Sequence, residues 1–443
     1  MAFTNLERRI ANLVGRSPVV RQQAKRAYQY LNYYLLRERG FTRELDRGCD
    51  LRTPEDWAGV GELPGETLFG YYDKSPWSCD GRYFLLHSLR SRDRSCPVDI
   101  VALDGAESRT IVVGGTTAWN FQQGAMLQWL HTASEPLVVF NDFQDADLVA
   151  RIARLDGAEL QRLPRPVQAL HAPSGVAASI NVNALLDNRV DYAYTRRARN
   201  LELTVDRDGL VLMDLATGES TLRTSLAWFI GNRPRADMEG TRHWLNHAMF
   251  SPSGRDIVLM HRWGDSRRRL SRLYRVPIAT GEPSLLLDHG MVSHYHWLDD
   301  QRLIVYAQAD TGIGYHVIDT NTARSRPIRD LGLEPLGDGH PTVSAASGLV
   351  AIDTYPDRRG VQSLHVFDPD DAAGALRSIV RVAHPPAFHG LARCDLHPRW
   401  HPREPLIAID SVLSGRRRCW IIECGNLFAP TEPARLDERG SSS

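Results

Sequence analysis

Short apolar runs separated by polar turns dominate the chain from about residue 51 onward. Each run follows an aromatic or histidine-bearing lead-in and a turn rich in Ser, Pro, Asp and Gly. Runs of this length, bounded by turn residues, predict β-strands. The same phrase recurs seven times, with apolar runs that begin at Tyr83, Leu137, Val176, Ile257, Leu303, Leu349 and Leu406.

The spacing of these seven units predicts how the strands are arranged. Most intervals have the length of one four-stranded propeller blade, and one longer interval indicates an insertion around Asp187 to Met238. Further strands can be read between units, as at Leu210 to Leu215. We therefore expect an all-β fold, a seven-bladed β-propeller. A pair of β-sandwiches is the alternative, because alternation and turn signals alone do not determine topology.

The N-terminal part of the chain has a different pattern. Apolar residues recur there at helical spacing, and basic residues outnumber acidic ones. We expect a basic helical extension over residues 1–50, the propeller over residues 51–429 and a disordered tail over residues 430–443. The extension suits either a helix packed on the main domain or a helix that binds a membrane surface or a protein partner.

Composition narrows the class of protein. The 443 residues carry 53 basic and 53 acidic side chains and are 42% hydrophobic, as in an ordinary soluble protein. Balanced charge argues against a nucleic-acid partner. The sequence predicts neither a signal peptide nor a membrane span, so we expect a cytoplasmic protein. Its six scattered cysteines form no CxxC pair, and we expect reduced thiols rather than a disulfide framework or a zinc knuckle.

One stretch near the end of the chain carries an unusual density of reactive groups. In an extended strand, Arg393, Asp395, His397 and Arg399 would project to one side. Three upstream segments also carry histidines, namely His243 to His247, His294 to His296, and His340.

Propeller geometry explains how these distant histidines can meet. Equivalent positions of successive blades converge on the central channel, and the four histidine segments belong to units four to seven. A single histidine beside a tryptophan is typical of packing, but four equivalent positions favour a shared site. Imidazole nitrogens with one carboxylate form a ligand set that suits manganese, iron, cobalt or zinc.

Two other stretches allow more than one interpretation. The segment Gly70 to Trp77 gathers aromatic residues, which suit either core packing or a wall for sugar rings. Asp353 and Asp357 follow the His340 unit. They indicate either a turn between strands or carboxylates that hydrogen-bond to a metal-binding histidine and so orient its ring.

The blade turns and histidine positions together resemble the oligogalacturonate lyase family, which is related to the TolB-type propellers. The resemblance covers roughly residues 60 to 428. It rests on Ser251-Pro252-Ser253-Gly254, Ser293-His294, Gly339-His340-Pro341 and His397-Pro398-Arg399-Trp400.

The resemblance implies a metal centre at one end of the channel. By motif, His294 matches a metal-binding histidine of the fifth blade, and His397 matches the ligand of the His-Pro motif in the last blade. Asp395 stands where the family has a second histidine, and the family's glutamine ligand has no clear match. We therefore predict His294, His340, Asp395 and His397 as the metal ligands.

The resemblance also implies a lyase that acts on acidic sugars. Cleaving a uronic-acid polymer by β-elimination requires a base to remove a weakly acidic carbon-bound proton, while cationic groups stabilise the resulting charge. We predict His247 as the base, with His243 as its alternative. Arg262, Arg393 and Arg399 are candidates to bind sugar carboxylates, because a guanidinium matches that anion in a bidentate manner.

Two alternative functions fit the same sequence. One is a non-catalytic propeller that binds a glycan or a protein partner in cell-surface polysaccharide assembly, working at the cytoplasmic face of the membrane. The other is a metal-dependent glycan hydrolase, in which the metal activates water.

Overall fold

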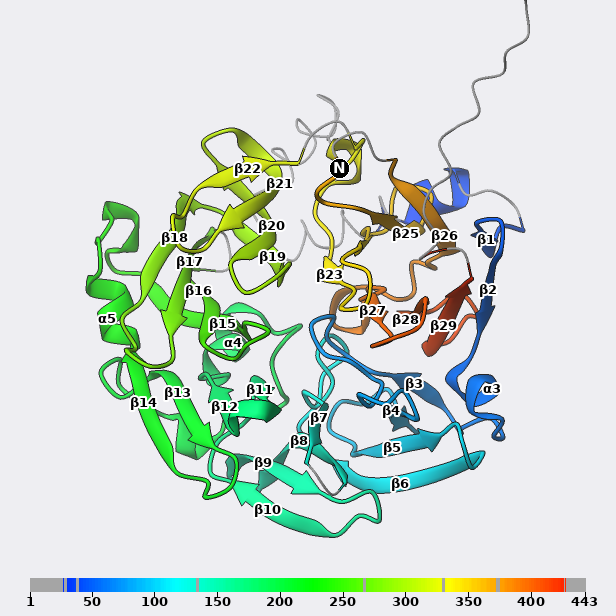
Figure 1. Cartoon of the computed structure of the whole chain (residues 1–443), viewed down its shortest axis with the longest axis horizontal. Helices are drawn as coiled ribbons and strands as arrows, with labels where there is room; N and C mark the ends of the chain where they lie inside the picture. The colour runs from blue at the N-terminus through cyan, green and yellow to red at the C-terminus, as the bar shows by residue number, and fades with distance from the viewer. Residues whose placement is uncertain are drawn as a thin grey trace, which may run out of the picture.

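The strands of this computed structural model form a ring of blades around a central axis (Figure 1), and we refer to the region on that axis as the central channel of the propeller. The structure describes residues 27, 30–36, 40–132, 135–265, 268–328, 331–371, 375–425 and 427. Within these residues there are seven antiparallel sheets, each built from four or five strands. The predicted seven-bladed β-propeller is therefore confirmed.

The blades follow the chain order, and the strands of each blade run outward from the channel. Blade 1 contains β3 (Glu66–Leu68), β4 (Tyr83–Leu89), β5 (Val98–Asp104) and β6 (Arg109–Thr116). Blade 2 contains β7 (Gln128–His131), β8 (Pro136–Gln144), β9 (Asp147–Ala153) and β10 (Glu159–Leu163). Blade 3 contains β11 (Ala169–His171), β12 (Val176–Ser179), β13 (Gly209–Asp214) and β14 (Ser220–Ser225).

Blades 4 to 7 complete the ring. Blade 4 contains β15 (Arg242–Phe250), β16 (Asp256–Gly264), β17 (Arg269–Pro277) and β18 (Ser284–Gly290). Blade 5 contains β19 (Val292–Trp297), β20 (Arg302–Ala309), β21 (Gly312–Asp319) and β22 (Ser325–Pro327). Blade 6 contains β23 (Thr342–Val343), β24 (Val350–Asp353), β25 (Val361–Phe367) and β26 (Arg377–Ala383). Blade 7 contains β27 (Arg399–Trp400), β28 (Leu406–Ser411) and β29 (Arg418–Cys424).

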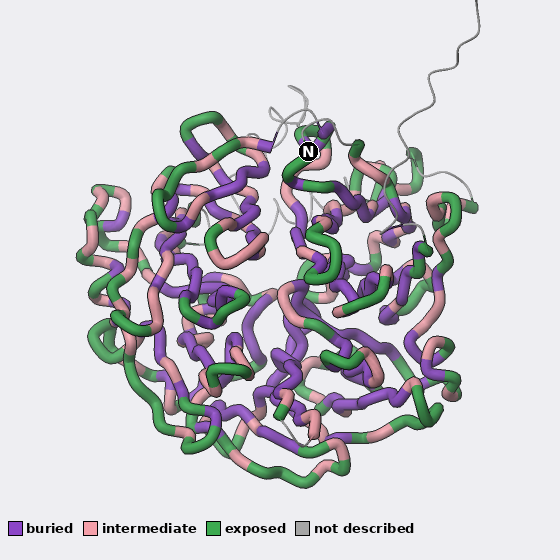
Figure 2. Tube along the Cα trace, viewed as in Figure 1, coloured by how far each residue is buried: buried purple, intermediate pink, exposed green. Residues whose placement is uncertain are grey.

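The seven apolar runs found in the sequence are the second strands of the seven blades, β4, β8, β12, β16, β20, β24 and β28. Every residue of β4 and of β28 is buried. A second strand is paired along both edges and covered by neighbouring blades on both faces, so most of its residues are apolar instead of alternating. Some buried positions are polar, namely His87 and Ser88 in β4 and Asp410 and Ser411 in β28. Figure 2 shows these strands as part of the buried interior, with exposed residues at the turns and on the outer strands.

Two strands near the N-terminus join the ends of the chain. Strand β1 (Arg43–Leu45) pairs with β26 in blade 6, and β2 (Cys49–Arg52) pairs with β29 in blade 7. Residues 43–52 therefore supply outer strands of the propeller, although the sequence assigned most of them to the helical extension. The pairing closes the ring with hydrogen bonds between segments that are far apart in the sequence.

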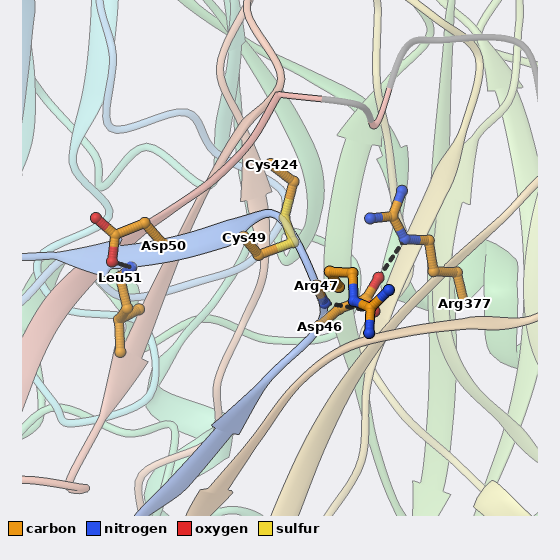
Figure 3. The surroundings of a disulfide bond; sticks show 7 residues. All are labelled: Asp46, Arg47, Cys49, Asp50, Leu51, Arg377 and Cys424. Carbon is orange, nitrogen blue, oxygen red and sulfur yellow. Dashed lines mark hydrogen bonds and ion pairs between the residues drawn. A yellow bond between two sulfur atoms is a disulfide. The ribbon is translucent and has the colours of Figure 1, made fainter.

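A disulfide bond between Cys49 and Cys424 reinforces this closure (Figure 3). The two cysteines face each other across the β2–β29 pair, with Cα atoms 4.2 Å apart and a sequence separation of 375 positions. The prediction of reduced thiols is wrong for these two cysteines. Sequence spacing gave no signal, because the pair becomes adjacent only when the ring closes. Cys79, Cys96, Cys394 and Cys419 are free.

Short helices occupy the connections between strands. They are α3 (Pro54–Ala58), η1 (Ala172–Ser174), α4 (Asn183–Asn188), η2 (Arg199–Leu201), α5 (Leu226–Gly231), η3 (Ala236–Met238), η4 (Glu334–Leu336) and η5 (Gly390–Ala392). The predicted insertion around residues 187–238 consists of two such connections, residues 180–208 and residues 226–241, with strands β13 and β14 between them.

Part of the predicted N-terminal extension is helical. Residues 30–36 form a helical segment on which Leu31, Tyr34 and Leu35 are exposed. Most of its predicted basic residues, and the tail at residues 430–443, lie outside the described residues. In the part of the chain that the structure describes, no helix combines the length and apolar character needed to cross a bilayer.

Candidate metal centre and arginine-lined cavity

The innermost strands of blades 4 to 7 carry the histidines to the channel. His247 lies in β15 and His294 in β19, while His340 and His397 lie two residues before β23 and β27. Neighbouring blades therefore bring together residues that are more than 40 positions apart, as the sequence predicted for equivalent blade positions.

Three buried side chains form a compact set of possible metal ligands. One nitrogen each of His340 and His397 and one carboxylate oxygen of Asp395 lie within 4.8 Å of one another. His340 Nε2, His397 Nε2 and Asp395 Oδ1 have no hydrogen-bond partner among the described residues. Unpaired buried polar atoms are costly, so a cation is the natural complement of this set. The residues thus fit a divalent ion such as manganese or zinc.

In each of the three possible ligands, the polar atom that does not point to the metal position makes a hydrogen bond. His340 Nδ1 lies 2.9 Å from Asp353 Oδ1, and His397 Nδ1 lies 2.8 Å from the Gly70 carbonyl. Arg393 Nε donates to Asp395 Oδ2 at 2.8 Å. The bonds to the two histidines place the imidazole proton on Nδ1 and leave Nε2 of His340 and His397 free to bind a metal. Asp353 therefore orients a histidine, one of the two roles that the sequence allowed.

His294 lies beside this set without belonging to it. Its ring centroid is 4.2 Å from that of His340, but among the described residues no group of three ligand atoms within 4.8 Å of one another includes His294. Its Nδ1 lies 3.0 Å from Asp338 Oδ1, and Asp338 Oδ2 accepts a hydrogen bond from Ser293 at 2.6 Å. The imidazole is therefore oriented by a carboxylate, with Nε2 on the opposite side of the ring.

His247, the predicted base, is enclosed by other side chains. Its Nε2 lies 3.3 Å from Asp73 Oδ2, and its Nδ1 lies 3.4 Å from the Tyr72 hydroxyl. The ring of Tyr295 stacks on it with centroids 4.5 Å apart. Burial lowers the pKa of His247 to about 4, despite the nearby Asp73 carboxylate. This imidazole packs among buried side chains and does not line the cavity described below.

His243, the alternative base, lies apart from the metal ligands. Its Nδ1 is 3.0 Å from His261 Nε2, and the two rings stack. Strand β15 has a register shift between Asn246 and Met249, and His247 within it has a left-handed backbone (φ 51°). This irregularity interrupts the strand between the two predicted bases, so the side chains of His243 and His247 do not share one face as they would in a regular strand.

A cavity of about 410 Å³ lies next to His294 and is rich in arginine. Its lining includes Arg189, Arg262, Arg269 and Arg393 together with Asp191, Asp338, Tyr355 and His294. The sequence predicted Arg262 and Arg393 and missed the other two arginines. Arg189 comes from the connection between β12 and β13, which carries no blade motif that could have indicated a functional residue.

Arg262 is a half-buried cation that has no carboxylate partner among the described residues. Its Nε has no hydrogen-bond partner among the described residues, and its Nη2 donates to the Val292 carbonyl at 3.3 Å. Burial, followed by the nearby charge of Arg189, lowers the pKa of Arg262 to about 10. An anion bound in the cavity would therefore relieve an unfavourable electrostatic environment.

Arg399 has a different environment from the one expected. It pairs with Asp410 at 2.8 Å, lies over the Phe69 ring and does not line the cavity. The prediction placed it on one face with Arg393, Asp395 and His397 in an extended strand. His397 instead adopts a left-handed backbone (φ 46°), which ends the alternation before Arg399.

The aromatic segment at Gly70 to Trp77 packs in the interior. Tyr71, Tyr72 and Trp77 are all buried. The Tyr72 ring contacts four imidazoles, those of His247, His294, His340 and His397. Of the two interpretations, the structure supports core packing, and the packed rings hold the histidines in place.

The chain resembles known proteins in structure but not in sequence. No protein-family model matches the chain, and no curated protein matches it in sequence. Among solved structures, an oligogalacturonate lyase from Vibrio parahaemolyticus matches with TM-score 0.54 and 12% identity, over 86% of this chain and 96% of the other. An oligogalacturonate lyase in complex with manganese matches with TM-score 0.38 and 13% identity, over 87% and 96%.

A TolB from Acinetobacter baumannii also matches, with TM-score 0.34 and 11% identity over 72% of this chain and 54% of the other. The structural neighbours thus include both groups that the blade turns indicated. At these identities the likeness shows the fold.

Proposed function

We propose that this protein is a metal-dependent lyase that cleaves uronic-acid-containing oligosaccharides or polysaccharides by β-elimination. The observation that carries the proposal is a set of three metal-binding groups adjoining an arginine-lined cavity. Two residues connect the parts: Arg393 lines the cavity and binds Asp395, and Tyr355 lines the cavity and packs against His340 with ring centroids 5.7 Å apart.

The cavity supplies what a uronate ligand requires. A sugar carboxylate needs cationic donors, and guanidinium groups bind it in a bidentate manner. Arg262 and Arg269 face this cavity, and Arg262 lacks a carboxylate partner among the described residues. These side chains would orient the carboxylate and hold the adjacent carbon-bound proton near the catalytic base.

His340, His397 and Asp395 are the residues that would hold the divalent ion, for which manganese is our first choice. When bound, the ion supplies positive charge that stabilises the enolate-like anion formed on proton removal. Asp353 and Gly70 keep the two imidazoles in the orientation that this role requires.

We assign the base to His294 in place of His247. His294 lines the cavity, and Asp338 binds its Nδ1 and thereby directs Nε2 as the proton acceptor. His247 has both ring nitrogens next to Tyr72 and Asp73 and lies outside the cavity lining. Positioned base catalysis of this kind contributes about 10² to 10⁴-fold to the rate.

We propose a cytoplasmic protein whose N-terminal helical segment contacts a membrane surface or a polysaccharide-assembly partner, on the basis of the basic N-terminal sequence and the exposed Leu31 and Leu35.

The test is incubation of the metal-loaded protein with a panel of acidic polysaccharides, followed by ultraviolet absorbance and reducing-end assays. β-Elimination produces a carbon–carbon double bond that absorbs in the ultraviolet. New reducing ends without that absorbance would indicate a hydrolase. Binding without any product would indicate a glycan-binding propeller and would contradict the proposed activity.

A further inference from the structure

The connection between β12 and β13, residues 180–208, reaches across to other blades and carries two charged residues into the cavity. Asn120, before blade 2, donates to the Tyr192 carbonyl at 3.1 Å, and Arg269 of blade 4 donates to the Asn188 carbonyl at 3.1 Å. Arg94 of blade 1 binds two further carbonyls of the same connection. The backbone around these charged residues is therefore held by side chains from blade 1, from blade 4 and from the segment before blade 2.

Asp191, one of the two, lies between two cavity arginines. Its carboxylate is 3.3 Å from Arg189 Nε, 3.3 Å from Arg189 Nη2 and 3.6 Å from Arg393 Nη1. These are long for charge-assisted hydrogen bonds, which usually measure about 2.7 to 2.9 Å. Arg393 binds Asp395 and Gln122 at 2.8 and 3.0 Å, so its contact with Asp191 is the weakest of the three.

Among the described residues, the Asp191 carboxylate forms ion pairs with arginines alone. Of the two acidic residues in the lining, Asp338 binds His294 and Ser293, whereas Asp191 pairs with Arg189 and Arg393. The Asp191 side chain is 21% exposed, so a ligand in the cavity can reach this carboxylate. An arginine pair held loosely by one carboxylate is suited to exchange that carboxylate for another.

We infer that Asp191 is an internal substitute for the ligand carboxylate, and that a ligand enters by displacing it from Arg189 and Arg393. The connection then determines selectivity, because only a ligand that offers an anion at this position recovers the lost ion pairs. This inference rests on the proposed function for the sugar identity of the ligand, but the displacement itself does not depend on the ligand being a sugar.

A purely structural role for Asp191 makes the opposite prediction. If Asp191 only positions Arg189, replacing it would disorder the guanidinium and weaken anion binding. If Asp191 competes with the ligand, the same replacement frees two arginines and strengthens anion binding. The sign of the change in affinity therefore distinguishes the two roles.

The experiment measures malonate binding to the full-length protein by isothermal titration calorimetry, for wild type and Asp191→Asn. Malonate is a small dicarboxylate that tests the anion site without a sugar. Asp187→Asn is the matched control, because Asp187 lies in the same connection and pairs with Arg197 and Arg242 at 2.7 Å but does not line this cavity. We expect Asp191→Asn to bind malonate about tenfold more tightly than wild type, and the control to match wild type.

Equal or weaker malonate binding by Asp191→Asn would overturn the inference. Melting temperatures establish that each variant is folded, and Asp191→Ser removes the same charge if the Asn variant does not fold. Adding Arg189→Gln to Asp191→Asn should abolish the gain, since it removes the freed donor. If the gain persists in the double variant, Arg189 is not the residue that Asp191 masks, and the inference fails.

Oligogalacturonate and a neutral galactose oligomer, measured in the same way, separate this inference from the proposed function. Tighter malonate binding without any binding of oligogalacturonate or other uronate oligomers would support the displacement and contradict the acidic-sugar ligand. Binding of uronates with unchanged malonate affinity in Asp191→Asn would support the ligand class and contradict the displacement.

Discussion

The imidazole rings of His340 and His397 lie 4.3 Å apart, centroid to centroid, although they come from different blades. With Asp395 they form the candidate set of metal ligands. We expect His340→Ala and His397→Ala each to abolish stoichiometric metal binding, measured by elemental analysis after incubation with manganese. Asp353→Asn should lower metal affinity by about 10 to 100-fold, because it loosens the orientation of His340.

His401→Asn is the control for this measurement. His401 lies four residues after His397 and accepts hydrogen bonds from the Arg403 and Glu404 backbone in a turn outside the ligand set. It should retain metal. Metal loss in His401→Asn alongside the other variants would indicate general unfolding, and metal retention in both alanine variants would contradict the assigned site.

Measuring metal content and turnover together distinguishes the roles of His294 and His247. His294→Gln should keep the metal and reduce turnover by about 10² to 10⁴-fold, because it removes the positioned base. His247→Gln should reduce turnover less at equal metal content, since its ring lies outside the cavity lining. Loss of metal from His294→Gln would instead make His294 a fourth ligand, as the family resemblance implied.

Arg262 couples ligand binding to stability. Arg262→Gln should raise KM for an acidic oligosaccharide about tenfold and leave binding of a neutral one unchanged. The same change should raise the free energy of unfolding by about 1 kcal/mol, because it removes a half-buried cation that has no carboxylate partner among the described residues. Arg255→Gln, an exposed residue of the same blade that faces Asp300 at 3.5 Å, is the control and should change neither quantity.

The Cys49–Cys424 bond should be detectable by thiol counting. Denatured, unreduced protein should show four reactive thiols and reduced protein six, as the free and total cysteines require. Cys49→Ser should lower the free energy of unfolding by about 2 to 4 kcal/mol, measured by denaturant titration. Cys79→Ser, at an exposed free cysteine, should leave it unchanged, and six thiols before reduction would show that the bond does not form.

His87 should make stability depend on pH. It is fully buried in β4, its Nδ1 donates to the Leu68 carbonyl at 3.2 Å, and its Nε2 accepts from the Ala125 backbone at 2.9 Å. Burial lowers its pKa to about 4, whereas the unfolded chain has the ordinary value of about 6.5. The unfolded state therefore binds the proton first as the pH falls, so stability is present above pH 6.5 and is lost toward pH 4.

His87→Gln does not titrate and isolates this effect. The stability advantage of wild type over the variant should shrink by about 2 kcal/mol between pH 7.5 and pH 5, measured by denaturant titration at each pH. An advantage that stays constant across this range would show that the folded-state pKa of His87 is not lowered.

The amino-acid sequence alone was sufficient for the propeller and for the approximate place of its histidines. The second strand of each blade is buried on both faces, so it carries a run of apolar residues, and seven such runs are visible without a structure. Because equivalent strands converge on one channel, His294, His340 and His397 could be expected to lie close together.

Only the tertiary structure decided which of those side chains meet and which do not. Left-handed backbone at His247 and His397 redirects the residues around them, so His243 and Arg399 leave the site that an extended strand would have given them. Arg189 and Asp191 enter from a connection without a blade motif, and Cys49 meets Cys424 only on ring closure. The alternation of polar and apolar residues along a strand indicates which of its faces is buried. Bulges, long connections and the closure of the ring depend instead on contacts between distant segments, which local sequence patterns do not encode.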